Sequence, residues 1–573
     1  MSHFGSIALC AISVACISTS LHATDQFRTV ALRGQLAPGG GGATFSSFNS
    51  SIELLAGGRA AFSAKLSTGP GGVTTNSDSG IWSEKSGALN LVVREGDAAP
   101  GAPAGAVFGE LSVGRWNSSG SLAFETALQI GTGGVTSSND AGIWADVGSG
   151  LQLIAREGSP APGTPSGVVF ADSFLGPELN ESGVLAFTGS LKTGSGGVTI
   201  DSNEGIWLMR GGPLSLLVRE GQQSPGGPAG AVLGGSNLDL INLSYPEVDS
   251  AGYVSFNGHM VVGTGGVTGS TDTGFWSERS GNLELTYREG MQAPGAVSGV
   301  KFFSFGGFPY TNANGRYSDQ HTLTGGDVSG IFDNGRGIYN DASGELKEIA
   351  RGGQPAPGTA AGTLFGFLSP PSFNDAGQSS FFGNLRNAAN SIPVTANEGI
   401  WSDANGALEL IVREGDVAPG IDSGAVVGPI DLHAYRPTLN NAGQSAFPLK
   451  LLQGVGGVTA GNDTGYWAQD MTGTLRLIVR EGDLLTVAPG DVRTIASFGL
   501  NGDARGFRFD DLGNLMFRAN FTDGSQGLFI ATAPVPEPNS CAILLLTVIV
   551  TRAARWRRTV APLPKIIPLV PSL

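Results

Sequence analysis

The 573-residue sequence predicts an all-β protein folded as an eight-bladed β-propeller whose last blade is completed by N-terminal strands. Three observations point to this fold. Three phrases recur about every 65 residues between positions 24 and 533, each unit holds about four strand-like segments, and the phrase counts balance only if the two ends of this region meet. An open β-repeat array is the alternative, since it has the same repeats without closure.

The first phrase has the form Asn-x-x-Gly-x-x-Ala-Phe, as in Asn117–Phe124, Asn180–Phe187 and Asn440–Phe447. Asn and Gly adopt positive φ at low cost, so the phrase predicts a turn. The alternating residues after the turn predict a half-buried strand. The turn glycines, spaced 62 to 70 residues apart, are Gly58, Gly120, Gly183, Gly252, Gly315, Gly377, Gly443 and Gly513.

The second phrase is Gly-Ile-Trp or a near relative, and it places one aromatic residue in each unit. These residues are Trp82, Trp144, Trp207, Trp276, Tyr339, Trp401, Trp467 and Phe529. The phrase lies in a short β-type run, so we expect the aromatic rings to pack in the core.

The third phrase is a Leu-rich strand that ends in Arg-Glu-Gly and is followed by Pro-Gly, as at Leu89–Gly101 and Leu408–Gly420. A fourth strand is expected in the Phe-containing stretch after that turn, for example at Ala106–Val113. A lone copy of the third phrase, Val30–Gly39, precedes the first complete unit, and the last unit lacks one. We therefore expect Arg28–Gly34 to join the blade that holds 515–519 and 528–531.

Composition excludes several classes of protein. Charged residues make up only 14% of the chain and hydrophobic residues 40%, which argues against a charge-rich disordered chain. The net charge is −15, and no basic patch is available for a nucleic acid. Cys10, Cys16 and Cys541 all lie outside positions 24–533, so the repeat region has no disulfide, thiolate metal site or cysteine nucleophile.

The N-terminal residues 1–23 are interpreted as a signal peptide. Ile7–Ile17 is an apolar run, and Ala23 is a small residue suited to cleavage before Thr24. A lipoprotein cleavage box at Ser13–Cys16 is the weaker alternative, because Ser13 stands where Leu is expected. The protein is therefore expected to be exported.

The C-terminal region divides into a tag at 534–558 and an extension at 559–573. The tag resembles a PEP-CTERM sorting tag, since a Pro-Glu-Pro motif precedes the short apolar helix expected at Cys541–Val550 and an arginine cluster follows it. The sorting residues are Pro536, Glu537, Pro538, Arg552, Arg555, Arg557 and Arg558. The resemblance implies an exosortase-type processing enzyme as partner, transient membrane insertion, and a Gram-negative cell surface or extracellular matrix. An ordinary C-terminal anchor helix is the alternative.

The repeats themselves resemble the tandem-repeat family named for its NxxGxxAF signature, over roughly Phe27 to Thr532. The resemblance implies extracellular display and transfers no activity to any residue. The expected function is a non-catalytic scaffold or adhesion module, with extracellular polysaccharide as a candidate partner. The alternative is a propeller glycosidase or lyase, which needs paired acidic groups at unrepeated positions, for example at the channel mouth.

Candidate sites within the repeats are interpreted as structural. Five units carry Gly-Gly-Val-Thr before an acidic or amide residue, which suits either a polar turn or a weak Ca²⁺ site, and the turn is favoured. Adjacent residues of a strand point to opposite faces, so each Arg-Glu pair is expected to bond to neighbouring backbone. His259, His321 and His433 are single residues in three units. We therefore expect no catalytic residue, cofactor or metal site.

Overall fold

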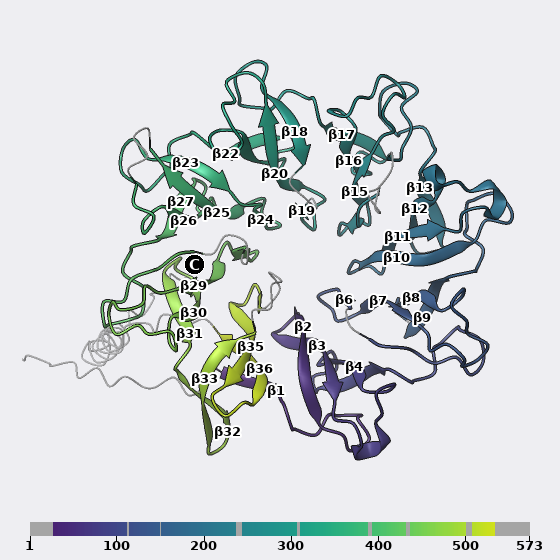
Figure 1. Cartoon of the computed structure of the whole chain (residues 1–573), viewed down its shortest axis with the longest axis horizontal. Helices are drawn as coiled ribbons and strands as arrows, with labels where there is room; N and C mark the ends of the chain where they lie inside the picture. The colour runs from purple at the N-terminus through teal and green to yellow at the C-terminus, as the bar shows by residue number, and fades with distance from the viewer. Residues whose placement is uncertain are drawn as a thin grey trace, which may run out of the picture.

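The computed structural model describes residues 27–111, 114–148, 150–235, 243–305, 310–387, 392–430, 436–499 and 507–532. These residues form eight antiparallel sheets, which stand side by side in a ring around a central axis (Figure 1). The protein is therefore an eight-bladed β-propeller, and the predicted fold class is confirmed. The predicted signal peptide and sorting tag lie outside the described residues.

Blades 1 to 4 each contain four strands in chain order. They are β2 (Phe45–Leu55), β3 (Arg59–Leu66), β4 (Ser79–Ser83) and β5 (Asn90–Arg94) in blade 1; β6 (Arg115–Trp116), β7 (Leu122–Ala127), β8 (Ala141–Asp146) and β9 (Leu151–Arg156) in blade 2; β10 (Phe170–Leu179), β11 (Leu185–Leu191), β12 (Glu204–Met209) and β13 (Ser215–Arg219) in blade 3; and β14 (Glu247–Val248), β15 (Val254–His259), β16 (Thr273–Ser277) and β17 (Glu284–Arg288) in blade 4.

Blades 5 to 8 follow the same plan, and blades 5, 6 and 8 contain additional short strands. They contain β18 (Lys301–Phe305), β19 (Tyr310–Thr311), β20 (Tyr317–Thr324), β21 (Arg336–Asn340) and β22 (Lys347–Arg351) in blade 5; β23 (Leu364–Leu368), β24 (Ser372–Phe373), β25 (Ser379–Arg386), β26 (Glu398–Ser402) and β27 (Glu409–Arg413) in blade 6; β28 (Thr438–Leu439), β29 (Ser445–Lys450), β30 (Thr464–Gln469) and β31 (Leu475–Arg480) in blade 7; and β32 (Leu484–Ala488), β33 (Asp491–Phe498), β34 (Phe507–Phe509), β35 (Asn514–Phe521), β36 (Gln526–Thr532) and β1 (Phe27–Leu32) in blade 8.

Helical structure is confined to three short 3₁₀ turns in the described residues, η1 (Pro70–Gly72), η2 (Ser195–Gly197) and η3 (Ile200–Ser202). No helix in this part of the chain is both long enough and apolar enough to cross a membrane. The apolar helix expected at Cys541–Val550 lies beyond the described part.

Each predicted phrase occupies a fixed place in its blade. The Asn-x-x-Gly turn leads into the second strand, the aromatic phrase is the third, and the Arg-Gly phrase is the outermost (Figure 1). All eight turn glycines have positive φ, between 65° and 86°, as the turn prediction requires. Here glycine avoids the steric cost that a Cβ would add.

Ring closure takes the predicted form. β1 pairs antiparallel with β36, so that Phe27 lies opposite Ala531 and Thr29 opposite Phe529. β36 pairs in turn with β35. The Arg28 guanidinium also binds Glu84 of blade 1 with nitrogen–oxygen distances of 2.6 and 2.9 Å, which connects the closing strand to the next sheet.

The core of each blade is built on its aromatic phrase. The Trp207 ring is fully buried, stacks on Phe187 at a centroid distance of 6.2 Å and meets Phe170 edge-on at 4.8 Å. Its Nε1 donates to the Pro162 carbonyl oxygen at 3.0 Å, so the buried polar atom is satisfied. The same donor contact pairs Trp82 with Pro38, Trp144 with Pro100, Trp276 with Pro225, Trp401 with Pro357 and Trp467 with Pro419.

The innermost strand is less regular than the sequence predicts. The stretch after the Pro-Gly turn forms a continuous strand in blades 1, 3, 5 and 6, with register shifts in every case. In blades 2, 4 and 7 it makes isolated bridges, such as Phe108 to Leu128, before a two-residue strand. Bulges leave residues of the bulged strand unpaired, and the alternation of one sequence does not reveal them.

Candidate functional site

The Asn-x-x-Gly turns link the blades to one another. Asn180 Oδ1 accepts from the backbone N–H groups of Ser182 and Val184 at 3.0 and 2.9 Å, which closes its own turn. Its Nδ2 donates to the Asp249 carbonyl oxygen of the next blade at 2.7 Å. The same donor contact joins Asn117 to Asn180, Asn312 to Asn374, Asn374 to Asn440 and Asn440 to Asp510.

The Arg-Glu phrase serves the scaffold, as its strand position predicts. Arg413 Nε donates to the Ala396 carbonyl oxygen at 2.9 Å. Glu414 accepts from the backbone N–H of Asn397 at 3.2 Å. The two side chains therefore bind different backbone groups, and both fasten the outermost strand of blade 6 to the start of its aromatic strand.

A second series of polar contacts reaches from several blades to the inner edge of the next blade. The residue before the aromatic phrase accepts a backbone N–H there: Ser79 Oγ from Leu111 at 2.8 Å, Glu204 Oε2 from Leu243 at 3.2 Å and Glu398 Oε2 from Ile430 at 2.6 Å. In blade 2 this residue is Ala141, whose side chain has no acceptor. The junction between blades 2 and 3 therefore lacks this contact.

A cleft of about 520 Å³ opens at that junction. Its lining residues are Glu110, Glu125, Thr126, Ala127, Ala141, Gly142, Asp172, Ser173, Phe174 and Leu175. Glu125 and Asp172 are exposed, whereas Phe174 is 4% exposed and gives an apolar wall. A second pocket, of about 170 Å³, lies beside the Arg279–Asp341 ion pair in blades 4 and 5.

The carboxyl groups of the cleft are not equivalent. The cleft walls displace part of the water around the exposed Glu125 side chain, and this desolvation raises its pKa to about 6, while the positive charge of Arg115 acts in the opposite direction. Glu110 is engaged by Lys65 of blade 1 at 2.7 Å. The cleft thus combines a carboxyl group whose pKa is raised with a second acidic side chain, Asp172, and with the hydroxyl groups of Thr126 and Ser173.

These acidic residues were missed in the sequence because they depart from the repeat. Glu125 follows the signature Phe124, where the other units carry Ser63, Thr188, Asn257, Gln320, Phe382, Pro448 and Arg518. Several of those residues bond to the next blade, as Gln320 does to the Leu368 carbonyl oxygen at 2.7 Å and Arg518 to that of Phe48 at 2.7 Å. The available signal was an acidic residue at a position where the other units have none.

Blade 5 carries polar groups at some positions that are aromatic in the other blades, while Phe302 and Tyr339 remain in contact in its core. Asp319 stands where other units have the signature Phe, and Tyr339 stands in the Trp row. His321 is fully buried and lies 3.0 Å from the Tyr317 hydroxyl oxygen through Nε2, and burial lowers its pKa to about 3. His321 is therefore a neutral core residue. His259 meets Thr273 at 3.4 Å, and His433 lies outside the described residues.

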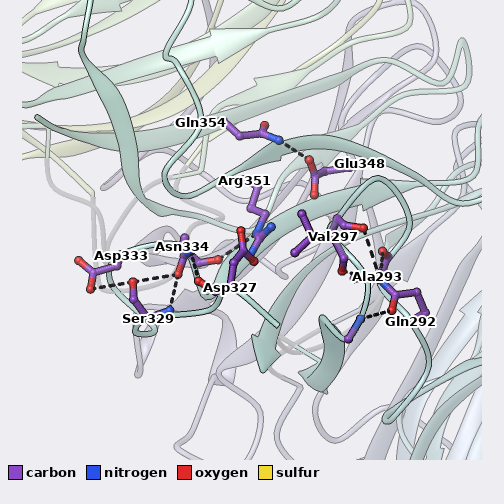
Figure 2. A network of polar contacts seen from close by, with 12 residues as sticks. Gln292, Ala293, Val297, Asp327, Ser329, Asp333, Asn334, Glu348, Arg351 and Gln354 are labelled. Carbon is purple, nitrogen blue, oxygen red and sulfur yellow. Dashed lines mark hydrogen bonds and ion pairs between the residues drawn. The ribbon is translucent and has the colours of Figure 1, made fainter. Parts of the chain in front are cut away.

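The loop before the aromatic strand of blade 5 is held by a polar network, which Figure 2 shows. Arg351 binds the Asp327 carboxylate at 2.8 Å and the Asn334 carbonyl oxygen at 3.0 Å. Asn334 donates to the Asp327 carbonyl oxygen at 2.8 Å and accepts from the Ser329 N–H at 2.8 Å. The network fixes the loop to the outermost strand, and these polar groups bind one another within blade 5.

The Gly-Gly-Val-Thr loops form the predicted polar turns. Val73 is buried at 3% exposure, and the Thr74 N–H donates to the Ser77 Oγ at 3.0 Å. The equivalent Thr of the other four loops is capped in the same way, by Asn139, Ser202, Thr271 and Asn462. Within the described ranges, no group of three or more His, Cys, Asp or Glu residues is arranged to hold a metal ion.

The sorting residues at 536–538 and 552–558 lie outside the described residues. The predicted absence of catalytic and metal residues in the ring stays a prediction. The cleft at blades 2 and 3 is the feature that bears on it.

Comparison with solved structures returns propeller-containing proteins at low similarity. They include an acylaminoacyl peptidase from Pyrococcus horikoshii (11% identity, TM-score 0.31, 74% of this chain and 52% of that chain). They also include the β-propeller domain of the Trilobed protease from Pyrococcus furiosus (10%, 0.31, 75% and 96%) and a Trypanosoma rangeli sialidase with the inhibitor DANA (11%, 0.26, 60% and 53%). This chain thus spans about half the length of the peptidase and of the sialidase.

Comparison with curated proteins gives no match. A family model, by contrast, matches most of the sequence, over residues 15–146, 126–202 and 194–542. Its description is a family of unknown function, DUF7453, and the chain belongs to that family.

Proposed function

We propose that the protein is an exported, non-catalytic propeller displayed on the surface or in the extracellular matrix of a Gram-negative bacterium. The use of the repeated polar residues supports this function most strongly. The turn Asn, the Arg-Glu phrase and the Thr of the polar loops all bind backbone or neighbouring scaffold groups, blade after blade. Such a ring is suited to presenting a rigid surface to extracellular polysaccharide or to another cell.

Sorting through the C-terminal tag is the part of this proposal that is simplest to test. The Pro536-Glu537-Pro538 motif precedes an apolar run of about half the roughly 20 residues needed for a helical membrane span. In the native host, mass spectrometry of the mature protein is expected to find no peptide containing Arg557 or Arg558. A Glu537→Ala variant is expected to retain those peptides. Recovery of intact Thr559–Leu573 from wild-type surface material contradicts sorting by processing.

A second function, a propeller enzyme acting on extracellular glycans, is favoured by the cleft between blades 2 and 3. Glu125 has the raised pKa of a general acid, and Asp172 supplies a second carboxylate in the same cleft. If Glu125 donates a proton in catalysis, turnover falls as pH rises through about 6, because the protonated form is lost.

The two functions are separated by one set of variants. Purified ring is tested for binding and hydrolysis of exopolysaccharide fragments, with Glu125→Gln and Asp172→Asn as site variants and the exposed Asp422→Asn as a matched control. Hydrolysis abolished by both site variants and kept by the control establishes the enzyme. Binding without hydrolysis, equal in all four proteins, supports the scaffold and places its ligand elsewhere.

A further inference from the structure

The residue two positions before the Gly of the aromatic phrase is Asn or Asp in six units. In blades 3 and 6 it is Asn. With its amide oriented so that both of its polar atoms are satisfied, Asn203 donates from Nδ2 to Glu220 Oε2 at 3.2 Å. Asn397 donates likewise to Glu414 Oε2 at 3.1 Å. A neutral amide thus holds the glutamate of the Arg-Glu phrase in these two blades.

In three other blades Asp takes the place of Asn. The resulting acid pairs are Asp140–Glu157, Asp272–Glu289 and Asp463–Glu481. In each, the two carboxyl groups lie within hydrogen-bonding reach of each other, and the glutamate also accepts a backbone N–H at the start of the aromatic strand, at 3.2 to 3.4 Å. A carboxylate has no hydrogen to donate, so the contact made by the Asn amide requires a proton here.

Neighbouring cations do not replace that proton. The basic and His side chains on strands β7–β9, β15–β17 and β29–β31 are Arg156, His259, Arg288, Lys450, Arg480 and Arg476, of which Arg476 pairs with Asp470. The other titratable side chains on these strands are Glu125, Asp146, Glu284, Tyr287 and Tyr466. In the described part of the chain, none of these basic or His side chains forms an ion pair with either member of an acid pair. Arg156, for example, is directed to the Asn139 carbonyl oxygen at 2.7 Å, and His259 Nδ1 to Thr273 Oγ1. Blade 1 differs, because Lys65 binds Asp78 at 2.9 Å.

We propose that each acid pair shares one proton in the folded ring and that this proton fastens the outermost strand to the aromatic strand, which makes the propeller more stable in mildly acidic than in neutral surroundings. The device is independent of the proposed function, since it requires only the folded ring. It acts at three places around the ring, in blades 2, 4 and 7.

The raised pKa values of the glutamates determine how the free energy of unfolding changes with pH. Burial and then the adjacent Asp raise the pKa of Glu289 and Glu481 from the ordinary 4.5 to about 7, and burial followed by the hydrogen bond to Asp140 raises that of Glu157. Between about pH 4.5 and about pH 7, the glutamates of the folded state therefore keep protons that the unfolded chain has lost. The free energy of unfolding therefore falls as pH rises from about 4.5 to about 7 and levels off above 7.

The test replaces each Asp of the acid pairs by the Asn that blades 3 and 6 already carry. Thermal unfolding of the full-length protein is measured between pH 5 and 8 for the wild type and for the triple variant Asp140→Asn, Asp272→Asn, Asp463→Asn. The wild-type midpoint temperature is expected to fall up to about pH 7. The triple variant is expected to show a shallower slope and a higher midpoint than the wild type at pH 7.5.

Two further measurements make the result decisive. Asp78→Asn in blade 1 is the matched control, because Lys65 already neutralises Asp78, and it is expected to leave the slope unchanged. Infrared spectra at pH 6 are expected to show a protonated carboxyl band that shifts in each single Asp→Asn variant, because an amide replaces the carboxyl group that shares the proton, so the test does not depend on the triple variant folding. A triple variant with the wild-type slope, or a carboxyl band unchanged in the single variants, overturns the proposal.

Discussion

A single indole ring in this fold carries several contacts at once. Trp207 stacks on one Phe, meets a second edge-on and donates a hydrogen bond to the carbonyl of Pro162. Its neighbour Gly205 has no side chain because the ring lies over it, and an added Cβ would be 2.8 Å from Trp207 Cη2. The Gly and the Trp of the phrase are therefore one packing unit, which accounts for their recurrence together.

Replacement of that ring is expected to be costly. Trp207→Ala removes a fully buried side chain and is expected to lower the free energy of unfolding by about 3–5 kcal/mol. Thermal unfolding followed by circular dichroism measures the loss. The half-buried Trp116 provides the control, and Trp116→Ala is expected to cost less. An unchanged midpoint for Trp207→Ala would contradict the core assignment.

The glycine of the unit gives a sharper prediction. Gly205→Ala is expected to destabilise the blade, because the new Cβ meets Trp207 at 2.8 Å and the Val218 carbonyl oxygen at 3.1 Å. Gly212→Ala is the matched control, since nothing lies within 4 Å of its Cβ. Denaturant unfolding of both variants measures the difference. Equal stability of the two would show that the ring can move aside.

At the residue scale, the sequence predicted the features that repeat and missed those that depart from the repeat. The aromatic row was predictable because eight copies fell in register within short β-type runs. The cleft was not, because it arises from Ala141 and Glu125, two departures in one unit whose meaning depends on the facing blade. The second role of the turn Asn was also hidden, since its Nδ2 acts between sheets.

At the scale of the strand, the outermost strand of every blade carries a bulge opposite the aromatic phrase. In blade 1 the register passes from Ile81–Val93 to Trp82–Leu91, which leaves Val92 unpaired and 43% exposed. The skipped residues of the other blades are Val30, Ile154, Leu217, Thr286, Ile349, Ile411 and Ile478. Bulged edges pair poorly with foreign strands, so the ring has eight outer edges that resist edge-to-edge association.

The turn that enters the second strand supports a prediction at the same scale. Asn180→Asp keeps the oxygen that closes the turn and removes the donor to the Asp249 carbonyl, so it separates the two roles of the side chain. We expect a loss of about 1–3 kcal/mol, measured by denaturant unfolding. Asn90→Asp is the control, because Asn90 bonds only within its own hairpin. Equal effects of the two substitutions would show that the link between blades contributes nothing.

The whole molecule depends on a sheet made from both ends of the repeat region. The prediction of closure succeeded because it came from counting phrases, which is independent of where each strand begins and ends. The inner edge of the ring was predicted less well, since its strands are bulged or reduced to bridges. Counting captures topology, whereas the register of an irregular strand is set by neighbours that a single sequence does not identify.

Closure is testable by a covalent link. Arg28 and Ile530 lie opposite each other in β1 and β36, so Arg28→Cys with Ile530→Cys is expected to form a disulfide in a background where the native cysteines are Ser. The oxidised protein is expected to gain about 2–4 kcal/mol in stability, measured against the same protein after reduction. Each single-cysteine variant is the control. A folded protein that fails to cross-link contradicts the pairing.

The pairing of β1 with β36 also has a consequence for synthesis, because the ring cannot close until β36 has been made. Arg33, which follows β1, binds the Gly524 carbonyl oxygen, which precedes β36, and the two residues are 491 positions apart. Strand β1 is therefore synthesised long before β36, the strand with which it pairs. At roughly 5–20 residues per second, that interval is about 25–100 s, far longer than a hairpin needs to form. All strands of the other seven sheets are synthesised before β36, so the eighth sheet is the last that can be completed. A chain that ends before Gln526 lacks β36 and therefore lacks the strand with which β1 pairs.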